Sequence, residues 1–419
     1  MRFLKLTSAT LTIAGLLGAC SDSAPPASAG ETIVATTTTV RPDDGQLLVG
    51  AILPRNGVAA ELGVSMSDAL ALAVNEINAA GGVGGEPVRV IEREEGDNEA
   101  TASLAMLELI QLGVDAIIGP TSSTNMLATL GMAVDAGVLT CSPTATALAL
   151  DSFPDNGLFI RTIASDSLQA KALSSLVESS GTSSAVIVYV DDNYGRPFAQ
   201  ETRLAVLAEG TAVTEMVPVT ASEDSMATAV AAVVATQAEV VVVIADGTTG
   251  PAIISAIDDA SVIAPTYVVN DAIRRPATSA QPFGRSLSAR IEGVSPLAYP
   301  ASDSFMESLR SINPSATGLF AQNGYDCLNA IAIAAVSAES DQPTAIARQI
   351  PIVTDQGTPC NNFAACAESL QAGRQIDYSG PGRDLTIGSD GEVVSAFFER
   401  FTFDVDGRDI SAGLVPVGS

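Results

Sequence analysis

The chain has 419 residues, 47% of them hydrophobic, so it can bury sizeable cores and is longer than one domain usually is. Its 48 acidic and 20 basic residues give a net charge of −28, which disfavours binding to nucleic acid or to an anionic membrane surface. Histidine is absent, which removes the commonest general base and metal ligand, so we expect no metal site and no cofactor. The acidic balance is typical of an acid-rich or halophilic proteome; the alternative is a cationic substrate.

The N-terminus has the composition of an export signal. Arg2 and Lys5 precede an uncharged apolar stretch that is too short for a good membrane span. The stretch ends in LGAC at residues 17–20, which resembles the bacterial lipobox, in which the Cys becomes the lipidated first residue. We expect a lipoprotein signal peptide at residues 1–19 and lipid on Cys20; the alternative is an ordinary signal peptidase site beside a chance Cys. Loss of the two basic residues would change the net charge from −28 to −30.

Residues 20–46 are rich in Ser, Thr, Pro and Ala and have little to bury, which predicts a flexible tether. The chain then alternates between strand and helix patterns. An apolar run at 47–53 predicts a strand, and Ser65 with Asp68 predicts a capped helix that ends at Gly81-Gly82. Further strands are expected at 88–92, 115–119 and 138–141, with helices at 100–112 and 123–136 between them. This alternation predicts a parallel sheet covered by helices on both faces.

The same pattern starts again near residue 166 and predicts a second doubly wound sheet. Strands are expected at 185–190, 213–219, 239–245 and 265–270, with helices at 166–180, 196–209, 224–236 and 250–260. Ligands bind at the carboxyl ends of strands in such folds, so two lobes predict a cleft between them. Beyond residue 295 we expect helices at 301–311 and 323–338, then a β-hairpin with turn signals at 389–391 and 406–407.

Four cysteines remain after Cys20, an even number that suggests disulfides in an exported protein. Cys360 and Cys366 are close enough in sequence to close a local loop. Cys141 and Cys327 would then form a second pair by elimination; the alternative is two free buried thiols.

Several motifs, in order along the chain, together resemble the type I periplasmic-binding proteins of the leucine/isoleucine/valine-binding family, the receptors of branched-chain amino acid ABC transporters. They are ALALAVNEINAAGGVGGEPVRV, IIGPTSST, SPTATALALD, FIRTIASDSLQAKAL, VDDNYGRPFA and FAQNGYDCLNAIAIA, and the resemblance covers roughly residues 47–405. It implies an α/β fold of two doubly wound parallel-sheet lobes joined by a multi-strand hinge. Lobe 1 would comprise residues 47–163 and 300–375, and lobe 2 residues 164–299 and 376–419.

The resemblance also implies where a ligand's α-carboxylate would bind. Matching motif to motif places Ser122 and Ser123 on one side of it and Thr144, Ala145 and Thr146 on the other. A helix N-terminus has unpaired N–H groups and a partial positive charge, so it can bind a carboxylate without an Arg. The alternative is that these hydroxyls only cap their own helices.

For the ligand's ammonium group the family places a carboxylate where this chain has Asp271, with Asn270 beside it; the alternative is that Asp271 only caps the next segment. Tyr194 matches an aromatic residue over the ligand. Leu62 stands where relatives have a large aromatic residue, which implies a different pocket floor, and an aromatic contact is missing near Ala245 and Asp246. The side-chain preference therefore stays open.

We expect a lipid-anchored, extracytoplasmic monomer that binds an α-amino acid or a close amide analogue and presents it to an ABC permease and its ATPase. The alternative is a ligand-sensing receptor domain of the same fold. An enzyme is disfavoured because no GxSxG, P-loop, GxGxxG or HExxH motif occurs.

Overall fold

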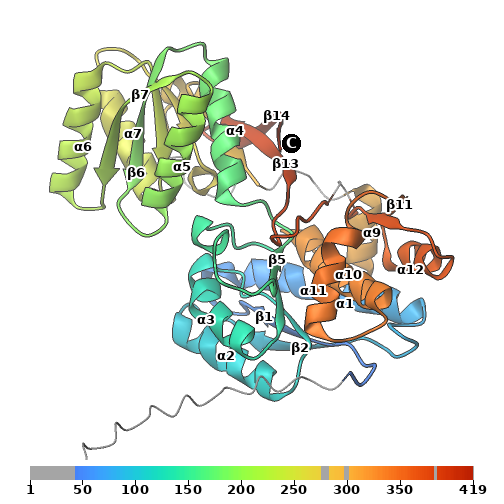
Figure 1. Ribbon diagram of the computed structural model, residues 1–419. Helices are drawn as coiled ribbons and strands as arrows, with labels where there is room; N and C mark the ends of the chain where they lie inside the picture. Colours follow the sequence, from blue (N-terminus) through green and yellow to red (C-terminus); the bar gives the residue numbers. More distant parts are fainter. Residues whose placement is uncertain (1–42, 275–282, 297–301, 382–384, 419) are drawn as a thin grey trace, which may run out of the picture. The chain divides into compact units, whose positions relative to one another are not determined.

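The computed structural model describes residues 43–274, 283–296, 302–381 and 385–418 (Figure 1). The expected signal peptide, the lipidation site Cys20 and the tether up to residue 42 lie outside these residues. Within the described ranges, no helix has the length and apolar character needed to span a membrane.

The first sheet has five parallel strands in the order β2-β1-β3-β4-β5. The strands β1, β3, β4 and β5 are short and largely buried, because helices cover both faces of a parallel sheet, whereas the edge strand β2 is only partly buried. Their bounds are Leu48–Leu53 (β1), Arg89–Glu94 (β2), Ala116–Ile118 (β3), Leu139–Ser142 (β4) and Phe159–Arg161 (β5). The helices between them are α1 (Ala60–Ala79), α2 (Glu99–Gln111) and α3 (Ser123–Asp135), with short 3₁₀ turns at Gly57–Ala59 and Leu148–Leu150.

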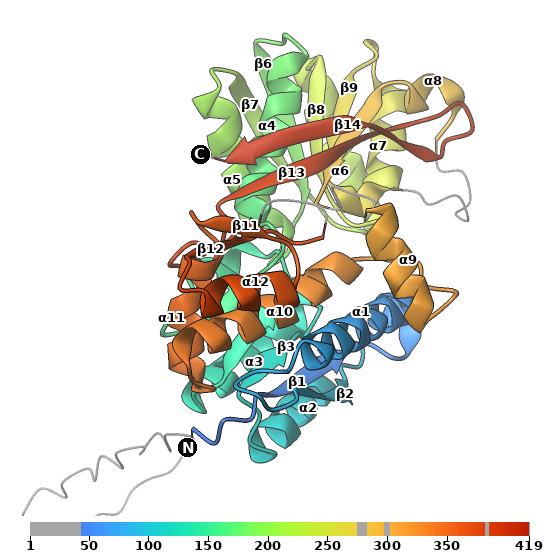
Figure 2. The same ribbon diagram turned by 90° about the vertical axis from the view of Figure 1, so that its right-hand side faces the viewer.

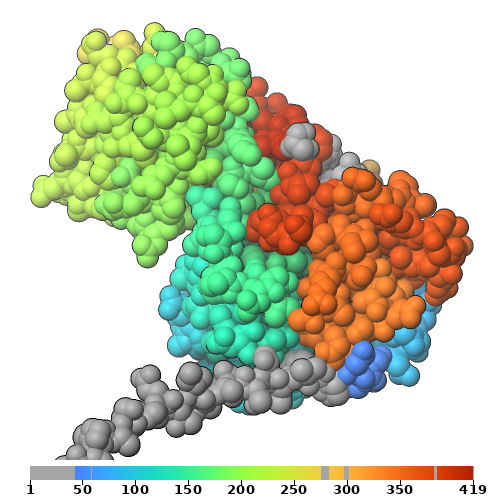
Figure 3. Space-filling model, in the orientation of Figure 1, coloured from blue at the N-terminus to red at the C-terminus, as the bar shows by residue number. Residues whose placement is uncertain are grey.

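Alternate residues of β1 enter two different cores, as the period of a strand requires. Val49 and Ala51 pack into the larger core with α1 and the later helix α10 (Ala321–Ala338), whereas Ile52 packs with α2 and α3. Figure 2 shows α1, α10 and α12 (Phe363–Gln371) lying together, and Figure 3 shows the orange surface of these later helices beside the teal surface of the first part of the chain. Also in this body are α9 (Asp303–Ile312), α11 (Pro343–Val353) and the two-stranded sheet of β11 (Thr358–Cys360) and β12 (Ile376–Tyr378).

The second sheet has seven strands in the order β14-β13-β10-β9-β8-β6-β7. The strands β7, β6, β8, β9 and β10 are parallel, and the C-terminal hairpin β13-β14 is added antiparallel at the β10 edge. The parallel strands are β6 (Ser184–Val190), β7 (Ala212–Val219), β8 (Val240–Ile244), β9 (Thr266–Val269) and β10 (Ile291–Ser295), and the hairpin is β13 (Ser395–Phe403) and β14 (Asp409–Gly418). Helices α4 (Asp166–Ser179) and α5 (Gly195–Ala208) cover one face, and α6 (Glu223–Thr236) and α7 (Thr249–Ala260) cover the other. The 3₁₀ turn Asp271–Ile273 follows β9, and the short helix α8 (Arg285–Ser288) precedes β10.

The two-sheet α/β architecture is therefore confirmed, including the C-terminal hairpin, and three stretches of chain connect the two sheets. They follow β5, β10 and β12. The structure moves one predicted boundary: residues 376–393 were expected in lobe 2, but Ile376, Tyr378, Ile387 and Val393 are buried in the first core. These apolar side chains are buried there before the chain reaches β13 in the second sheet.

The predicted start of the first helix was wrong. Helix α1 begins at Ala60, and Ser65 is buried inside it rather than capping its start. The helix packs tightly against the preceding loop: a Cβ added at Gly63 would lie only 1.6 Å from the carbonyl oxygen of Pro54, so only glycine fits there. Helix propensity alone could not locate this start, because the close packing of Gly63 against Pro54 depends on the conformation of the loop.

Candidate functional site

A cavity of about 750 Å³ lies at the carboxyl edge of the first sheet, where the loops after β1, β2 and β3 meet. Ser122, at the start of α3, is part of its lining. The other lining residues are Pro54, Ala59, Glu95, Gly96, Asp97, Asn98, Glu99, Ala100, Thr121, Thr124 and Asn125.

Glu95, which the sequence analysis missed, organises the loop after β3. Its buried carboxylate accepts hydrogen bonds from the backbone N–H of Thr121 (2.9 Å), from the Thr121 hydroxyl (2.6 Å), from the backbone N–H of Ser122 (2.9 Å) and from the side-chain amide of Asn125 (3.0 Å). The N–H of Ser122 is therefore already bonded within the protein. The strand pattern before Glu95 gave no sign of this role, because an acid after a strand is usually exposed.

The two hydroxyl-rich loops are bonded to each other. The Thr144 hydroxyl donates to the carbonyl of Thr121 (2.8 Å), and the N–H of Ala147 donates to the Ser123 hydroxyl (3.3 Å). The N–H of the buried Ala145 donates to the Ser142 hydroxyl (2.8 Å). The predicted residues after β3 and β4 are thus brought together at one edge of the sheet.

Ser122 is also a helix cap, the alternative that the sequence left open. It is the N-cap of α3, and its Oγ accepts from the N–H of Asn125 at 3.5 Å. A cap and a ligand contact are compatible, because the hydroxyl hydrogen of a capping Ser stays available to donate.

The carboxyl edge of the second sheet presents acidic and aromatic groups instead. Asn270 is fully buried after β9, and its Oδ1 accepts from the N–H of Ala245 at 3.1 Å. The Asp271 carboxylate accepts from the side-chain amide of Gln169 at 2.8 Å, and desolvation by burial raises its pKa above the ordinary value for Asp. At the same edge Asp246 caps α7, accepting from the N–H groups of Thr248 and Thr249.

Asp166 is a second acid of this group, and the sequence analysis did not select it. It is the first residue of α4, only 1% exposed, and its Oδ1 has no hydrogen-bond partner among the residues that the structure describes. Burial and the nearby negative charge of Asp271 raise its pKa well above the ordinary value, against a hydrogen bond from Thr146 that acts to lower it. The signal available in sequence was its position at a helix start, which reads as an ordinary first-turn acid.

Tyr194, at the start of α5, lies close to both acids. Desolvation raises its pKa well above the ordinary tyrosine value, and the charges of Asp166 and Asp271 raise it further. Its ring packs edge-on against Phe198, with 5.8 Å between the centroids. Tyr194, Asn270 and Asp271 are thus brought together as predicted.

Two points connect the sheet edges. The backbone N–H of Asp166 donates to the carbonyl of Thr146 at 2.9 Å, and the Thr146 side chain hydrogen-bonds to the Asp166 carboxylate. The hydroxyl-rich loop and the acidic pair therefore adjoin each other.

Leu62, by contrast, is half-buried against the first core, and Ala59 rather than Leu62 lines the cavity. A ligand contact of Leu62 stays a prediction.

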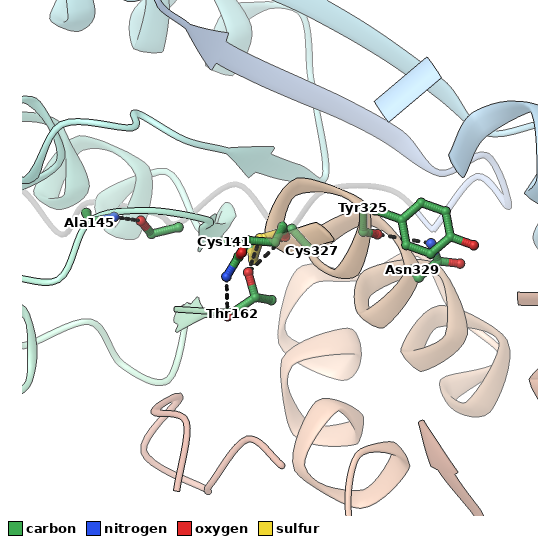
Figure 4. Close-up of a disulfide and its surroundings, with 8 residues drawn as sticks. Cys141, Ala145, Thr162, Tyr325, Cys327 and Asn329 are labelled. Carbon is green, nitrogen blue, oxygen red and sulfur yellow. Dashed lines mark hydrogen bonds between the residues drawn. A yellow bond between two sulfur atoms is a disulfide. The ribbon is translucent and has the colours of Figure 1, made fainter. Parts of the chain in front are cut away.

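Both cysteine pairs are at disulfide distance. Cys360 and Cys366 have Cα atoms 5.3 Å apart, and Cys141 and Cys327 have Cα atoms 5.9 Å apart. Figure 4 shows the second pair joining the end of β4 to α10, with Thr162 beside it. This bond anchors the strand that leads into the Thr144–Thr146 loop.

Comparisons with known proteins agree with this architecture. The model of a family described as periplasmic binding protein matches residues 46–396. A Leu/Ile/Val-binding protein homolog from Brucella abortus is 40% identical over 91 residues, which are 21% of this chain and 22% of that relative's length. The chain thus matches only about a fifth of that curated relative.

Solved structures match nearly the whole chain. A substrate-binding protein of an ABC transporter from Desulfitobacterium hafniense, in complex with Leu, has a TM-score of 0.67 at 17% identity and covers 87% of this chain and 99% of its own. A solute-binding protein from R. palustris, in complex with benzoate, has a TM-score of 0.61 at 17% identity and covers 90% and 98%. Both are described as binding proteins of ABC transporters and were solved with a small carboxylic acid bound. The chain belongs to the periplasmic binding protein family and has the type I fold of the leucine-, isoleucine- and valine-binding proteins of ABC transporters, a family assignment that implies a place outside the cytoplasm.

Proposed function

We propose that this protein is the substrate-binding component of an ABC importer and that its ligand is an α-amino acid or a close amide analogue. The ligand carboxylate would be bound by Ser122 and Ser123 together with Thr144, Ala145 and Thr146. Its ammonium group would be bound by Asp271 and by Asp166, and Tyr194 and Asn270 would complete that end of the site.

The Asp166–Asp271 pair is the observation that carries this proposal. The fully buried Asp166 carboxylate is repelled by that of the partly buried Asp271. The charge of Arg161 acts on Asp166 and that of Arg274 on Asp271, but neither acid forms a direct ion pair with a Lys or Arg among the described residues. A bound ammonium group would compensate both charges, because a buried charge is costly unless it is paired. The adjoining hydroxyl-rich loops offer hydrogen bonds and a helix N-terminus for the opposite end of a zwitterion.

A purely aromatic acid is the competing ligand, because a related fold binds benzoate. The acid pair disfavours it, since benzoate brings a third negative charge and no cation. Calorimetric titration with L-leucine, L-isoleucine, small amides and benzoate tests the choice. We expect a dissociation constant well below millimolar for at least one amino acid or amide and no measurable binding of benzoate. Binding of benzoate without binding of any amino acid or amide would refute an ammonium site.

We further propose that the protein acts as a monomer, is anchored outside the cytoplasm through lipid on Cys20 and delivers its ligand to a permease and ATPase. Expression of the full precursor and its Cys20→Ser variant tests the anchor. The wild type should sediment with membranes and the variant should be released; equal distribution would remove Cys20 from this role.

A further inference from the structure

Arg161 is a fully buried arginine at the end of β5, just before the chain leaves the first sheet. Its Nε donates to the Glu392 carboxylate at 2.8 Å, and its Nη2 forms an ion pair with Asp151. Burial acts to lower the pKa of Arg161, but the charges of Glu392 and Asp151 outweigh it and raise the pKa above its ordinary value. The guanidinium is therefore charged, and the two carboxylates compensate its charge.

The remaining donor of Arg161 reaches the hydroxyl-rich loop. Its Nη1 donates to the carbonyl of Ala145 at 3.3 Å and to the carbonyl of Ala147 at 3.4 Å. These carbonyls belong to the two residues that flank Thr146, so the planar guanidinium restrains the loop both before and after a residue of the proposed site. A lysine could not make these contacts together, because only a guanidinium presents several donors in a rigid plane.

The same network contacts two of the connections between the sheets. Glu392 lies in the stretch after β12, where the N–H of Arg161 also donates to the carbonyl of Gly391 at 3.0 Å. Gly391 has φ +80°, and a Cβ there would lie 2.1 Å from the carbonyl oxygen of Phe159, so the two backbones lie in close contact. Asp151 also accepts from the hydroxyl of Ser165 at 2.8 Å, and Ser165 is the N-cap of the helix that begins with Asp166.

We propose that Arg161 is a positioning residue of the ligand site, which fixes the Ala145–Ala147 loop for a ligand carboxylate and links that loop, through Glu392 and Asp151, to the segments that connect the two sheets. The inference rests on the proposed function and deepens it. It means that carboxylate recognition depends on a side chain that itself does not touch the ligand. It also means that the geometry of the connecting segments is coupled to the site.

The loop after β3 provides an internal reference, because Glu95 rather than Arg161 holds it. Amide hydrogen exchange of the ligand-free protein can compare the two loops in one sample. In Glu392→Gln we expect amides of residues 145–147 to exchange at least about tenfold faster, while residues 121–125 are unchanged. Equal protection of residues 145–147 in variant and wild type would overturn the inference.

Glu292→Gln is a matched control, since it also removes one carboxylate from an arginine pair. The Glu292 side chain is 15% exposed and that of Glu392 14%. Glu292 accepts from Arg400 in the second sheet and has no hydrogen bond to either loop within the described part of the chain. The control should leave exchange in both loops unchanged. Faster exchange of residues 145–147 in the control as well would show a general loss of stability and would count against the inference.

Binding separates positioning from a merely structural role. In Arg161→Lys and Glu392→Gln we expect L-leucine to bind at least about tenfold more weakly, and L-leucinamide, which lacks the carboxylate, to change less than about twofold. A proportional loss for both compounds would contradict the inference. If the wild type binds neither these compounds nor benzoate, the proposed function fails, and the exchange result still decides the role of Arg161.

Discussion

The carboxyl edges of the two sheets are built from opposite chemistry. The first edge carries small hydroxyls and backbone amides that are largely bonded to one another, through Glu95, Thr144 and Ser123. The second edge carries the buried Asp166 and the partly buried Asp271, whose pKa values are raised. An anion can be bound by fixed dipoles, which carry no net charge and therefore do not destabilise the ligand-free protein. A cation in a desolvated place needs carboxylates, and these are uncompensated in the absence of the cation. This difference predicts that the first edge is rigid and that ligand binding stabilises the second edge more than the first.

The largest effect is expected where the first edge is anchored to its core. Replacing Cys141 and Cys327 together by Ala opens a link across 186 residues, which should cost about 5 kcal/mol in the chain-entropy relation. Replacing Cys360 and Cys366, only 6 residues apart, should cost about 2 kcal/mol. Urea unfolding under non-reducing conditions measures both; a larger loss for the shorter loop would contradict this ranking.

The second edge should dominate ligand affinity. Asp271→Asn should weaken L-leucine binding by about 3 kcal/mol or more, because it removes a proposed charged partner of the ammonium group that the ligand would desolvate. Asp224→Asn, in the first turn of α6, is the control and should leave the affinity unchanged. Calorimetry of both variants decides the matter, and retention of wild-type affinity by Asp271→Asn would exclude this residue from the site.

The pH dependence should follow the same acids. Protonation of Asp166 or Asp271 removes the charge that attracts the ammonium group, so affinity for L-leucine should fall as the pH drops through their raised pKa values, by up to about tenfold per pH unit for each proton taken up. Titrations from pH 8 to pH 4 follow this. An affinity that rises in acid would show that the bound ligand carries no ammonium contact.

In the absence of ligand, the buried carboxylate of Asp166 should lower the stability of the protein. Because the pKa of Asp166 is raised in the folded state, the native protein binds more protons than the unfolded chain, and stability falls as the pH rises through that window. Asp166→Asn should therefore stabilise the ligand-free protein at neutral pH by about 1–2 kcal/mol and much less in acid. Urea unfolding at both pH values checks the sign; destabilisation at neutral pH would mean that the carboxylate is compensated.

The smallest effect is expected for the cap at the first edge. Ser122→Ala removes the N-cap of α3 and should cost about 1 kcal/mol of stability. If Ser122 also donates to the ligand, affinity for L-leucine should fall by a similar amount. Loss of stability with unchanged affinity would leave Ser122 as a cap alone, which thermal unfolding and calorimetry on the same variant can distinguish.

Sequence patterns predicted most of the fold because parallel strands and their helices have local signatures. The run before Ala245 and the helix pattern within 323–338 both match observed elements. The short strands Phe159–Arg161 and Ile376–Tyr378 were missed, since three residues carry no periodicity. The loops of the site were found through motif resemblance, whereas Glu95, Arg161 and Asp166 were not, because a single charged residue in a sequence does not reveal whether it will be buried.

The sequence by itself determined the two α/β bodies, because strand period, helix caps and turn residues act over a few neighbours. The hydroxyl-rich loops and Asp271 were singled out by the resemblance of their motifs to a known family. The tertiary structure alone decided which charges lie buried beside those loops, and with what partners. Burial and pairing depend on segments far apart in the chain: Asp166 lies next to Asp271, and Arg161 next to Glu392, only after both sheets and their connections have formed. Desolvation then shifts the pKa values of these ordinary acidic and basic groups at the candidate site.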